Sequence, residues 1–388
     1  MDERMLKGWK KVKLEEIAQV LKRAWKVGNE KLPYIGLEHI EESSLRLKTI
    51  GFSDDIKSNK YIFTEEEFLF GKLRPYFRKL YNPKFKGICS TDIWVVAPKE
   101  NTDKNFLFYL FATYEFIDLA TKGASGTRMP RAEWNFMKKT EWIIPESIDE
   151  QRAIASVLSS LDDKIDLLHR QNKTLEAMAE TLFRKWFIEE AEEDWEEKQL
   201  FEIAEHKKVN IVPNKDPEIE FLHFSIPAFD AGKKPIKELG MEIKSNKYKV
   251  FEHSILISKL NPRLPRVWAI WGKIENKEYS VCSTEFIVVF PKKKEYFSFI
   301  YYLLKSIQVT NELIGAASGT SGSHQRVKAR DIFELSFSFN EKKSLYFHTV
   351  VKKFLDKIRS NEQQIHTLEK LRDTLLPKLM SGEVRVKV

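Results

Sequence analysis

The chain has 388 residues, of which 42% are hydrophobic, and a formal net charge of +8. This length allows two or more domains, and the positive charge favours a polyanion such as nucleic acid as a partner. No run of about 18 apolar residues occurs, so we expect no membrane span. Two cysteines, Cys89 and Cys282, are too few for a disulfide framework, and no secretion signal opens the chain, so we expect a cytoplasmic protein.

The first 147 residues combine short strand-like runs with longer helix-like runs. FLFGKL (68–73) and DIWVVAP (92–98) are apolar and short, which is typical of buried strands. NFLFYLFATYEFIDLAT (105–121) is longer and favours helix. The mixture predicts an α+β (mixed α/β) globular domain over residues 1–147.

Two cationic segments stand out in this domain. GKLRPYFRK (71–79) directly follows a strand-like run, and GASGTRMPRAEW (123–134) is a Gly/Ser/Thr loop. Backbone N–H groups of such loops can hold phosphate, and arginine can pair with base edges, although a solvated surface turn is the alternative for each. The candidate DNA contacts are Lys72, Arg74, Arg78, Lys79, Thr127, Arg128 and Arg131.

Residues 148–193 are predicted to form a long helix. Apolar residues recur there at alternating spacings of four and three, with an asparagine in one slot, which is the pattern of a heptad seam. Residues 151–199 carry 7 Lys and Arg against 12 Asp and Glu, so this helix is a poor candidate for lying along a phosphate backbone. The seam residues are Leu161, Ile165, Leu168, Asn172, Leu175, Ala179, Leu182 and Trp186.

The remainder of the chain repeats the first part. WKKVKLEEIA (9–18) matches WEEKQLFEIA (195–204), CSTDIWVVAPK (89–99) matches CSTEFIVVFPK (282–292), and ASGT recurs at 317–320. Matches in one order at a nearly constant offset indicate an internal duplication. We therefore predict a second domain over 194–339, a second long helix over 340–380 and a tail at 381–388.

The second repeat carries its own cationic segments, SKLNPRLPR (258–266) and GAASGTSGSHQR (315–326). The loops share a pattern but differ at their tips, as expected if the two domains read different DNA sequences. Its candidate DNA contacts are Lys259, Asn261, Arg263, Arg266, Thr320, Ser321, Ser323, His324, Gln325 and Arg326. Its seam residues are Phe354, Ile358, Asn361, Ile365, Leu368, Arg372, Leu375 and Leu379.

Each seam needs a partner. We expect the two helices to pack on each other as a coiled coil, with the seam asparagines fixing register; the alternative is that each seam packs on its own domain. Two similar halves tend to pack about a pseudo-two-fold axis, which predicts antiparallel helices with the domains at opposite ends. A helix of this length spans roughly 55 Å, more than one turn of B-DNA, as a ruler between two reading domains would require.

The sequence contains none of the motifs GxGxxG, GxxxxGK[ST], HExxH or CxxC. We therefore predict no catalytic residue, no metal site and no cofactor on this chain. A methyltransferase or nuclease acting alone is disfavoured, and both cysteines are interpreted as buried and inert.

The motifs GKLRPYFRK, GICSTDIWVVAP, GASGTRMPRAEW and IIPESIDEQRAIASVLSSLDDKIDLL resemble those of the specificity subunits of type I restriction–modification systems. The resemblance covers essentially the whole chain, in duplicate. The second repeat departs from it, because FSFNEKKSLYF (337–347) lacks the Pro and Glu-Gln of IIPESIDEQRAI (143–154), which predicts weaker or different docking at the second helix.

The resemblance implies two target recognition domains separated by two antiparallel spacer helices. Each domain would read one half of an asymmetric, bipartite site in double-stranded DNA. The helices would set the gap and dock two modification (methyltransferase) subunits, and restriction subunits would join that core. S-adenosylmethionine, ATP and Mg would be bound by the partner subunits. A coiled-coil scaffold that binds only proteins is the alternative.

Overall fold

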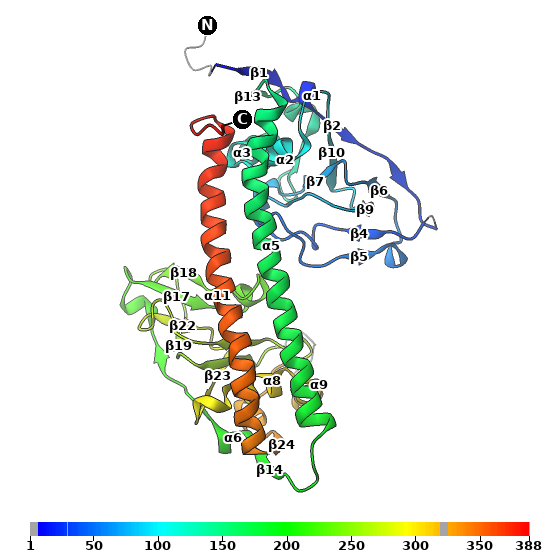
Figure 1. The fold of residues 1–388 in the computed structure, drawn as a ribbon. Coiled ribbons are helices and arrows are strands. Elements are labelled where there is room, and N and C mark those ends of the chain that lie inside the picture. Colours follow the sequence, from blue (N-terminus) through cyan, green and yellow to red (C-terminus); the bar gives the residue numbers. More distant parts are fainter. Residues whose placement is uncertain (1–6, 29, 319–324, 388) are drawn as a thin grey trace. The chain divides into compact units, whose positions relative to one another are not determined.

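The computed structural model describes residues 7–28, 30–318 and 325–387. The chain forms two compact units (Figure 1). Unit 1 comprises residues 1–168 and 364–388, and unit 2 comprises residues 169–363. Each unit therefore contains one globular domain together with parts of both long helices.

Unit 1 is built on two sheets. Its strands are β1 (Trp9–Lys13), β2 (Ala18–Leu21), β3 (Ala24–Trp25), β4 (Pro33–Ile35), β5 (Gly51–Phe52), β6 (Lys60–Phe63), β7 (Phe68–Gly71), β8 (Leu80–Tyr81), β9 (Gly87–Cys89), β10 (Ile93–Pro98), β11 (Ala124–Ser125), β12 (Arg131–Ala132) and β13 (Glu141–Pro145). One sheet is antiparallel in the order β2-β10-β7-β8. The other has the order β3-β6-β9-β4-β5, in which β4 and β9 run parallel. The short pairs β1-β13 and β11-β12 complete the unit.

Unit 2 repeats these strand orders. Its strands are β14 (Glu196–Gln199), β15 (Ala204–His206), β16 (Asn210–Ile211), β17 (Glu220–Phe224), β18 (Ile236–Leu239), β19 (Lys247–Lys249), β20 (Ser254–Ser258), β21 (Val267–Ile270), β22 (Ser280–Cys282), β23 (Phe286–Pro291) and β24 (Ser336–Phe339). The sheets run β15-β23-β20-β21 and β16-β19-β22-β17-β18, and β17 and β22 are parallel. The same topology in both units confirms the predicted tandem repeat of an α+β domain.

Short helices cover the sheets: α1 (Leu14–Ile17), α2 (Lys104–Ala112), α3 (Tyr114–Lys122) and α4 (Trp134–Met137) in unit 1, and α6 (Leu200–Ile203), α7 (Ile226–Asp230), α8 (Phe297–Lys305), α9 (Ile307–Ala316) and α10 (Ala329–Phe333) in unit 2. Residues 105–121, which the sequence predicts as one helix, belong to two helices, α2 and α3, and α8 and α9 form the same pair in unit 2. The break falls at Thr113 and at Ser306, whose hydroxyls accept hydrogen bonds from the backbone N–H of Phe116 and Val309. A residue that caps a new helix in this way ends the helix before it.

The two long helices are α5 (Ile148–Arg184), continued by a π-helical turn at Lys185–Glu189, and α11 (Glu341–Met380). They pack antiparallel within each unit. In unit 1, Asp162 pairs with Arg372, and Ile165 and Leu168 pack with Ile365. In unit 2, the side chain of Asn361 donates to that of Asn172 at 2.8 Å, and the rings of Trp186 and Tyr346 stack. The two seam asparagines thus meet each other, as a register-setting polar pair would.

All the predicted seam residues are buried or half-buried. Those that are buried are Ile165, Leu168, Ala179, Asn361, Ile365, Arg372 and Leu379. Those that are half-buried are Leu161, Asn172, Leu175, Leu182, Trp186, Phe354, Ile358, Leu368 and Leu375. A cluster made only by the two helices is small, however, and consists of Ile165, Leu168 and Ile365 with Leu368 beside them.

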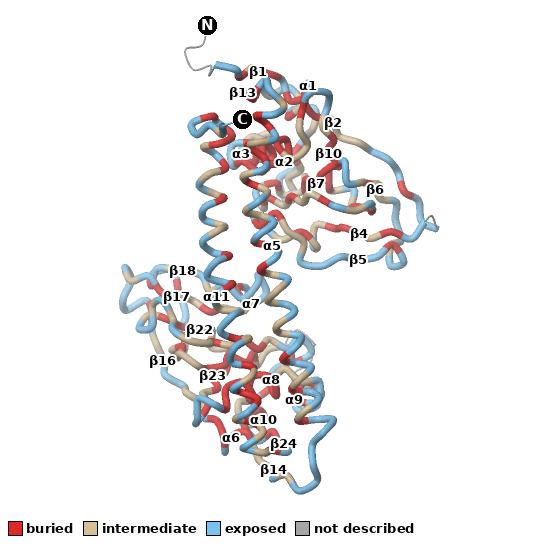
Figure 2. The backbone as a smooth tube through the Cα atoms, viewed as in Figure 1, coloured by how far each residue is buried: buried red, intermediate tan, exposed pale blue. Residues whose placement is uncertain are grey.

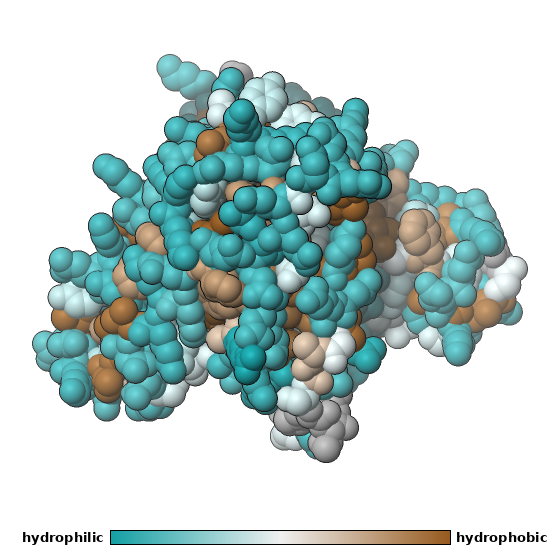
Figure 3. Space-filling model, turned by 90° about the horizontal axis from the view of Figure 1, so that it is seen from below, coloured by the Kyte–Doolittle hydropathy of each residue, from teal (hydrophilic) through white to brown (hydrophobic). Residues whose placement is uncertain are grey.

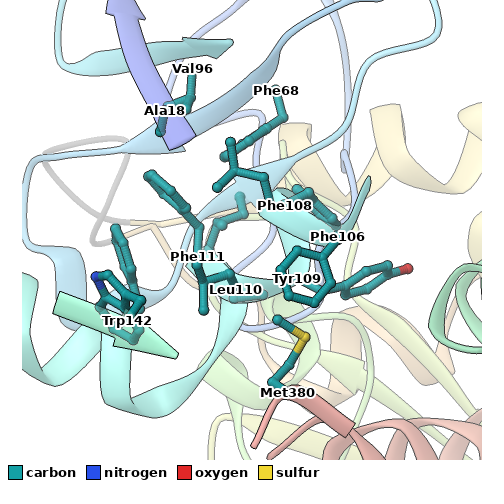
Figure 4. Close-up of a cluster of buried hydrophobic side chains, with 14 of the residues drawn as sticks. Ala18, Phe68, Val96, Phe106, Phe108, Tyr109, Leu110, Phe111, Trp142 and Met380 are labelled. Carbon is teal, nitrogen blue, oxygen red and sulfur yellow. The ribbon is translucent and has the colours of Figure 1, made fainter. Parts of the chain in front are cut away.

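Elsewhere the helices pack on the domains, so the alternative interpretation of the seam also holds in part. In unit 1, Leu158 of α5 and Leu376, Leu379 and Met380 of α11 belong to one buried cluster with α2 and α3. Figure 4 shows Met380 pointing toward Leu110 and Tyr109 of α2. The ends of the long helices therefore complete the domain cores.

In unit 2 the ends of the long helices also complete the domain core. Phe183 of α5, Phe187 of the π-helical turn that continues it and Phe347 of α11 are buried in a cluster with Phe299 of α8. Figure 2 shows the buried residues concentrated along the sheets and the facing sides of the helices, and the face drawn in Figure 3 is mainly hydrophilic. Phe183 and Phe187 stand beside the heptad seam and were not predicted to be part of it.

The Glu-Gln pair in the first turn of α5 has a structural role in unit 1. Glu150 is buried, receives two hydrogen bonds from Arg385 Nη2 at 2.9 and 3.0 Å, and accepts one from the indole N–H of Trp9. Gln151 is buried and donates to the carbonyl of Pro145 at 3.0 Å. Both side chains therefore hold unit 1 together and are not exposed to a partner.

The second repeat has a different residue and a different contact at the equivalent position. Lys343 replaces Glu150, and its ammonium lies 5.0 Å from the ring centroid of Trp195, the counterpart of Trp9. The indole N–H of Trp195 has no acceptor among the described residues. A cation–π contact thus replaces the hydrogen bond.

A carboxylate in α5 ties this helix to α8 in unit 2. Glu176 accepts hydrogen bonds from the hydroxyls of Tyr301 at 2.8 Å and Tyr302 at 3.1 Å, and it pairs with Lys305. Burial works to raise the pKa of Glu176, but Lys305 and the hydrogen bonds outweigh it and hold this pKa below its ordinary value of 4.5.

We expect this contact to make unit 2 acid-sensitive. Because the pKa of Glu176 is lower in the folded than in the unfolded chain, its stabilising contribution is present above the unfolded value and is lost as pH falls through the folded value. Wild-type unit 2 should therefore lose more free energy of unfolding below about pH 4.5 than Glu176→Gln does. Urea unfolding followed at several pH values would measure this. The control Glu180→Gln, which alters a more exposed partner of Lys305, should keep the wild-type acid dependence.

Candidate nucleic-acid interface

Three segments of unit 1 that are far apart in sequence meet at one edge of the four-stranded sheet. The turn after β7 is joined to the loop before β12 by hydrogen bonds from Arg74 N to Pro130 O at 2.7 Å and from Ala132 N to Lys72 O at 2.9 Å. It is joined to the turn before β10 by a bond from Lys72 N to Asp92 O at 2.9 Å. We call residues 72–79, 90–92 and 126–131 edge 1.

Unit 2 contains the same hydrogen-bonded arrangement. Asn261 N donates to Gln325 O at 2.9 Å, Val327 N to Lys259 O at 3.0 Å, and Lys259 N to Glu285 O at 2.8 Å. Arg74 and Asn261, at equivalent places, both have left-handed backbone with φ of 49° and 50°. We call residues 259–266, 283–285 and 325–326 edge 2.

An arginine–carboxylate pair supports each edge. Arg131 Nε donates to Asp92 at 2.9 Å, and Arg326 Nε donates to Glu285 at 3.1 Å. Both arginines use two guanidinium nitrogens on the carboxylate, which fixes their orientation. The sequence predicts DNA contacts at both arginines; in the structure their bonds to the carboxylates brace the loops.

The other predicted contacts differ in exposure. Thr127, Arg128 and Arg263 are exposed, whereas Lys72, Arg74, Lys259, Asn261 and Gln325 are half-buried along the edges. The ammonium of Lys79 donates to the carbonyl of Leu37 at 2.9 Å, and the guanidinium of Arg266 is bidentate to Asp230 at 2.7 and 2.9 Å. Thr320, Ser321, Ser323 and His324 lie outside the described residues.

Arg78 corrects the sequence analysis. The motif GKLRPYFRK predicts a surface cation, but only 1% of Arg78 is exposed. Its Nε donates to the carbonyl of Ala112 at 2.7 Å, beneath edge 1. The side chain turns inward because α3 and α11 supply an aromatic ring and a carboxylate there, from Tyr114 and Asp373. Arg78 is therefore not placed to contact DNA.

Edge 2 borders a basic hollow that joins two of the predicted contacts, Lys259 and Arg326, with two lysines that were not predicted, Lys208 and Lys328. This hollow of about 330 Å³ is lined by Lys208, Lys259, Arg326 and Lys328, with His206 and Tyr248 beside them. Burial, together with Lys208 and Lys259, lowers the pKa of His206, so its ring is neutral at pH 7. The basic runs HKK (206–208) and RVKAR (326–330) were the available signal, but only the fold brings them together.

Edge 1 differs in charge at the corresponding position. By its place two residues after the bracing arginine, Glu133 corresponds to Lys328, and it accepts a hydrogen bond from the hydroxyl of Ser125 at 2.6 Å. A carboxylate therefore borders edge 1 at the place where an ammonium borders edge 2. A common backbone with different side chains is suited to contacting two different sequences.

Other chemistry is limited in the described parts of the chain. Cys89 and Cys282 are buried and unpaired, as predicted, and burial raises the pKa of both thiols, that of Cys282 to about 12. The described residues contain no group of His, Cys, Asp and Glu that could hold a metal ion. Among them, no helix is long and apolar enough to cross a membrane.

Comparison with known proteins shows which proteins this chain resembles. Residues 6–177 match the family model described as the type I restriction modification DNA specificity domain. The type I restriction enzyme MjaIX specificity subunit of Methanocaldococcus jannaschii is 29% identical over 322 residues, which span 75% of this chain and 72% of the relative. The chain is therefore similar to the specificity subunits of type I restriction enzymes.

Two further comparisons extend the likeness over nearly the whole chain. The putative MjaX specificity subunit of the same organism is 22% identical and covers 98% of this chain and 94% of its own length. The crystal structure of the S subunit from M. genitalium has a TM-score of 0.57 at 15% identity and covers 98% of this chain and 97% of its own. The latter likeness supports the fold alone.

Proposed function

We propose that this chain is the specificity subunit of a type I restriction–modification system and that it reads a bipartite site in double-stranded DNA, with edge 1 on one half and edge 2 on the other. The observation that carries the proposal is the pair of edges, which share one hydrogen-bonded backbone arrangement and differ in their side chains. The lysines of the two edges, and the arginines that are paired with carboxylates, would contact phosphates. The exposed side chains Arg128 and Arg263 would contact bases. A scaffold that binds only proteins would need no such pair.

The proposal includes the partners. The chain itself would be non-catalytic, and the paired helices α5 and α11 would space the half-sites and dock two modification subunits, which restriction subunits then join. S-adenosylmethionine, ATP and Mg would be bound by those subunits. The complex would act in the cytoplasm.

Selection from a pool of random duplex DNA tests this function. The chain would be used alone and together with modification subunits, and bound DNA would be sequenced. We expect one enriched motif of two short specified blocks separated by a fixed unspecified gap. Enrichment of no motif, or of a single undivided block, would reject the proposal, and methyl transfer by the isolated chain would point to an enzyme instead.

The assignment of each edge to one half-site can be tested with two exposed arginines, Arg128 of edge 1 and Arg263 of edge 2. Arg128→Ala should change base preference in one half-site by about 1–3 kcal/mol per altered base pair and leave the other half-site intact, because the two tips belong to different units. The matched variant Arg263→Ala should affect the opposite half-site. A uniform loss over both halves would show that Arg128 contacts phosphate rather than a base.

A further inference from the structure

We propose that Arg78 is a positioning residue, which holds the turn of edge 1 against helix α11 through Asp373 and thereby sets base preference in one half-site only. This inference rests on the proposed function for its DNA consequence. Its structural part stands on contacts within unit 1.

Arg78 anchors the turn from beneath. Its Nε donates to the carbonyl of Ala112 at the end of α2, and its Nη1 lies 3.8 Å from Asp373 of α11. The guanidinium carbon is 4.7 Å from the ring centroid of Tyr114 at the start of α3. One buried side chain thus connects the turn with three helices.

The charges around Arg78 leave Asp373 as its key partner. Arg372, of which 2% is exposed, donates to Asp162 at 2.9 Å and to Asp373 at 3.1 Å. Neither Nη1 nor Nη2 of Arg78 has a hydrogen-bond acceptor among the described residues. Two buried guanidiniums therefore share two carboxylates, and removing the charge of Asp373 leaves Arg78 without its nearest counter-charge.

The backbone of the turn needs such an anchor. Arg74 and Arg78 both have positive φ, of 49° and 48°, a region that residues with side chains seldom occupy. Backbone of this kind persists only where surrounding contacts determine it. Lys72, Arg74 and the exposed Tyr76 lie in the same turn, so loss of the anchor would move the groups that face DNA.

Edge 2 is held by its own domain instead. The bond from Ser258 N to Arg266 O matches that from Gly71 N to Lys79 O, so Pro265 takes the place of Arg78. Proline has no side-chain donor, and the turn is tied by Arg266 to Asp230 of α7. A change in α11 near Asp373 should consequently reach edge 1 and spare edge 2.

The experiment compares Asp373→Asn with the matched variant Asp230→Asn in the full chain. Hydrogen exchange of residues 71–81 should rise in Asp373→Asn, and that of residues 258–267 should rise in Asp230→Asn. In selection from random duplex DNA, each variant should lose roughly fivefold discrimination in one half-site, and the two half-sites should differ. Asp373→Glu, which retains the charge, should keep the wild-type preference.

The outcomes are separable. Unchanged exchange in residues 71–81 would overturn the anchoring, and equal losses in both half-sites of Asp373→Asn, or increased exchange with no change in preference, would overturn the positioning role. If Asp373→Asn fails to fold, Arg78→Lys tests the other contact of the anchor: it keeps the charge beside Asp373 but loses the Nε–H bond to Ala112, so exchange of residues 71–81 should still rise and the same half-site should still lose discrimination. If even the wild type selects no motif, the proposed function fails, while the exchange data still decide the anchoring.

Discussion

Replacing Phe183 with alanine is expected to lower the free energy of unfolding of unit 2 by about 3–5 kcal/mol. Only 4% of this side chain is exposed, and its ring lies between 5.3 and 5.9 Å, centroid to centroid, from those of Phe187, Phe299 and Phe347. Removal of the ring leaves a cavity among aromatic neighbours that cannot all move to fill it. Urea unfolding monitored by tryptophan fluorescence would measure the loss.

The exposed Met178, on the same helix, provides the control, and Met178→Ala should change stability by less than about 0.5 kcal/mol. Phe183 belongs by sequence to the first repeat. If Phe183→Ala increased hydrogen exchange in unit 1 and left unit 2 unchanged, our assignment of this part of α5 to the core of unit 2 would be wrong.

The second large effect concerns the hollow beside edge 2. Changing Lys208, Lys259 and Lys328 together to glutamine should weaken DNA binding roughly 100-fold near 0.1 M salt, because each ammonium that neutralises a phosphate releases counterions. The slope of log K against log salt should become shallower by about 2.7, at about 0.9 for each contact. A fluorescence titration with duplex DNA over a range of salt concentrations gives both numbers.

The control is a triple variant of equal charge. Lys273, Lys292 and Lys294 are exposed near the opposite end of the same four-stranded sheet, since Ile270 pairs with Ser254 and Pro291 ends β23. Their change to glutamine should alter the slope little. Equal slopes for both triple variants would mean that net charge, rather than the hollow, attracts DNA.

Much of this architecture could be predicted from the sequence, because it depends on local patterns. The apolar run before Pro98 and that before Pro291 predict β10 and β23, and the spacing of Ile165 and Leu168 predicts a buried helix face. The internal duplication could be predicted because short sequence segments recur in the same order in both halves of the chain. The cations of edges 1 and 2 could be predicted because they follow strand ends, where turns reach the surface.

The rest depends on contacts between distant parts of the chain. Arg78 is inside because Asp373, far away in sequence, and the carbonyl of Ala112 lie beneath its turn. Glu150 is buried because Arg385 reaches it. Lys208 and Lys328 border one hollow only when β15 and the segment before α10 are placed side by side. No periodicity in the sequence carries such information.

The C-terminal end of α11 belongs to unit 1, although it is encoded in the second repeat, and this has a consequence for biosynthesis. Unit 1 begins the chain, yet Leu376, Leu379 and Met380, which close its core, are translated about 200 residues after Leu168. At about 5–20 residues per second, the nascent domain waits roughly 10–40 s with an apolar surface uncovered. The domain that leaves the ribosome first is therefore the last to be completed. During that interval its uncovered apolar surface is a binding site for a chaperone.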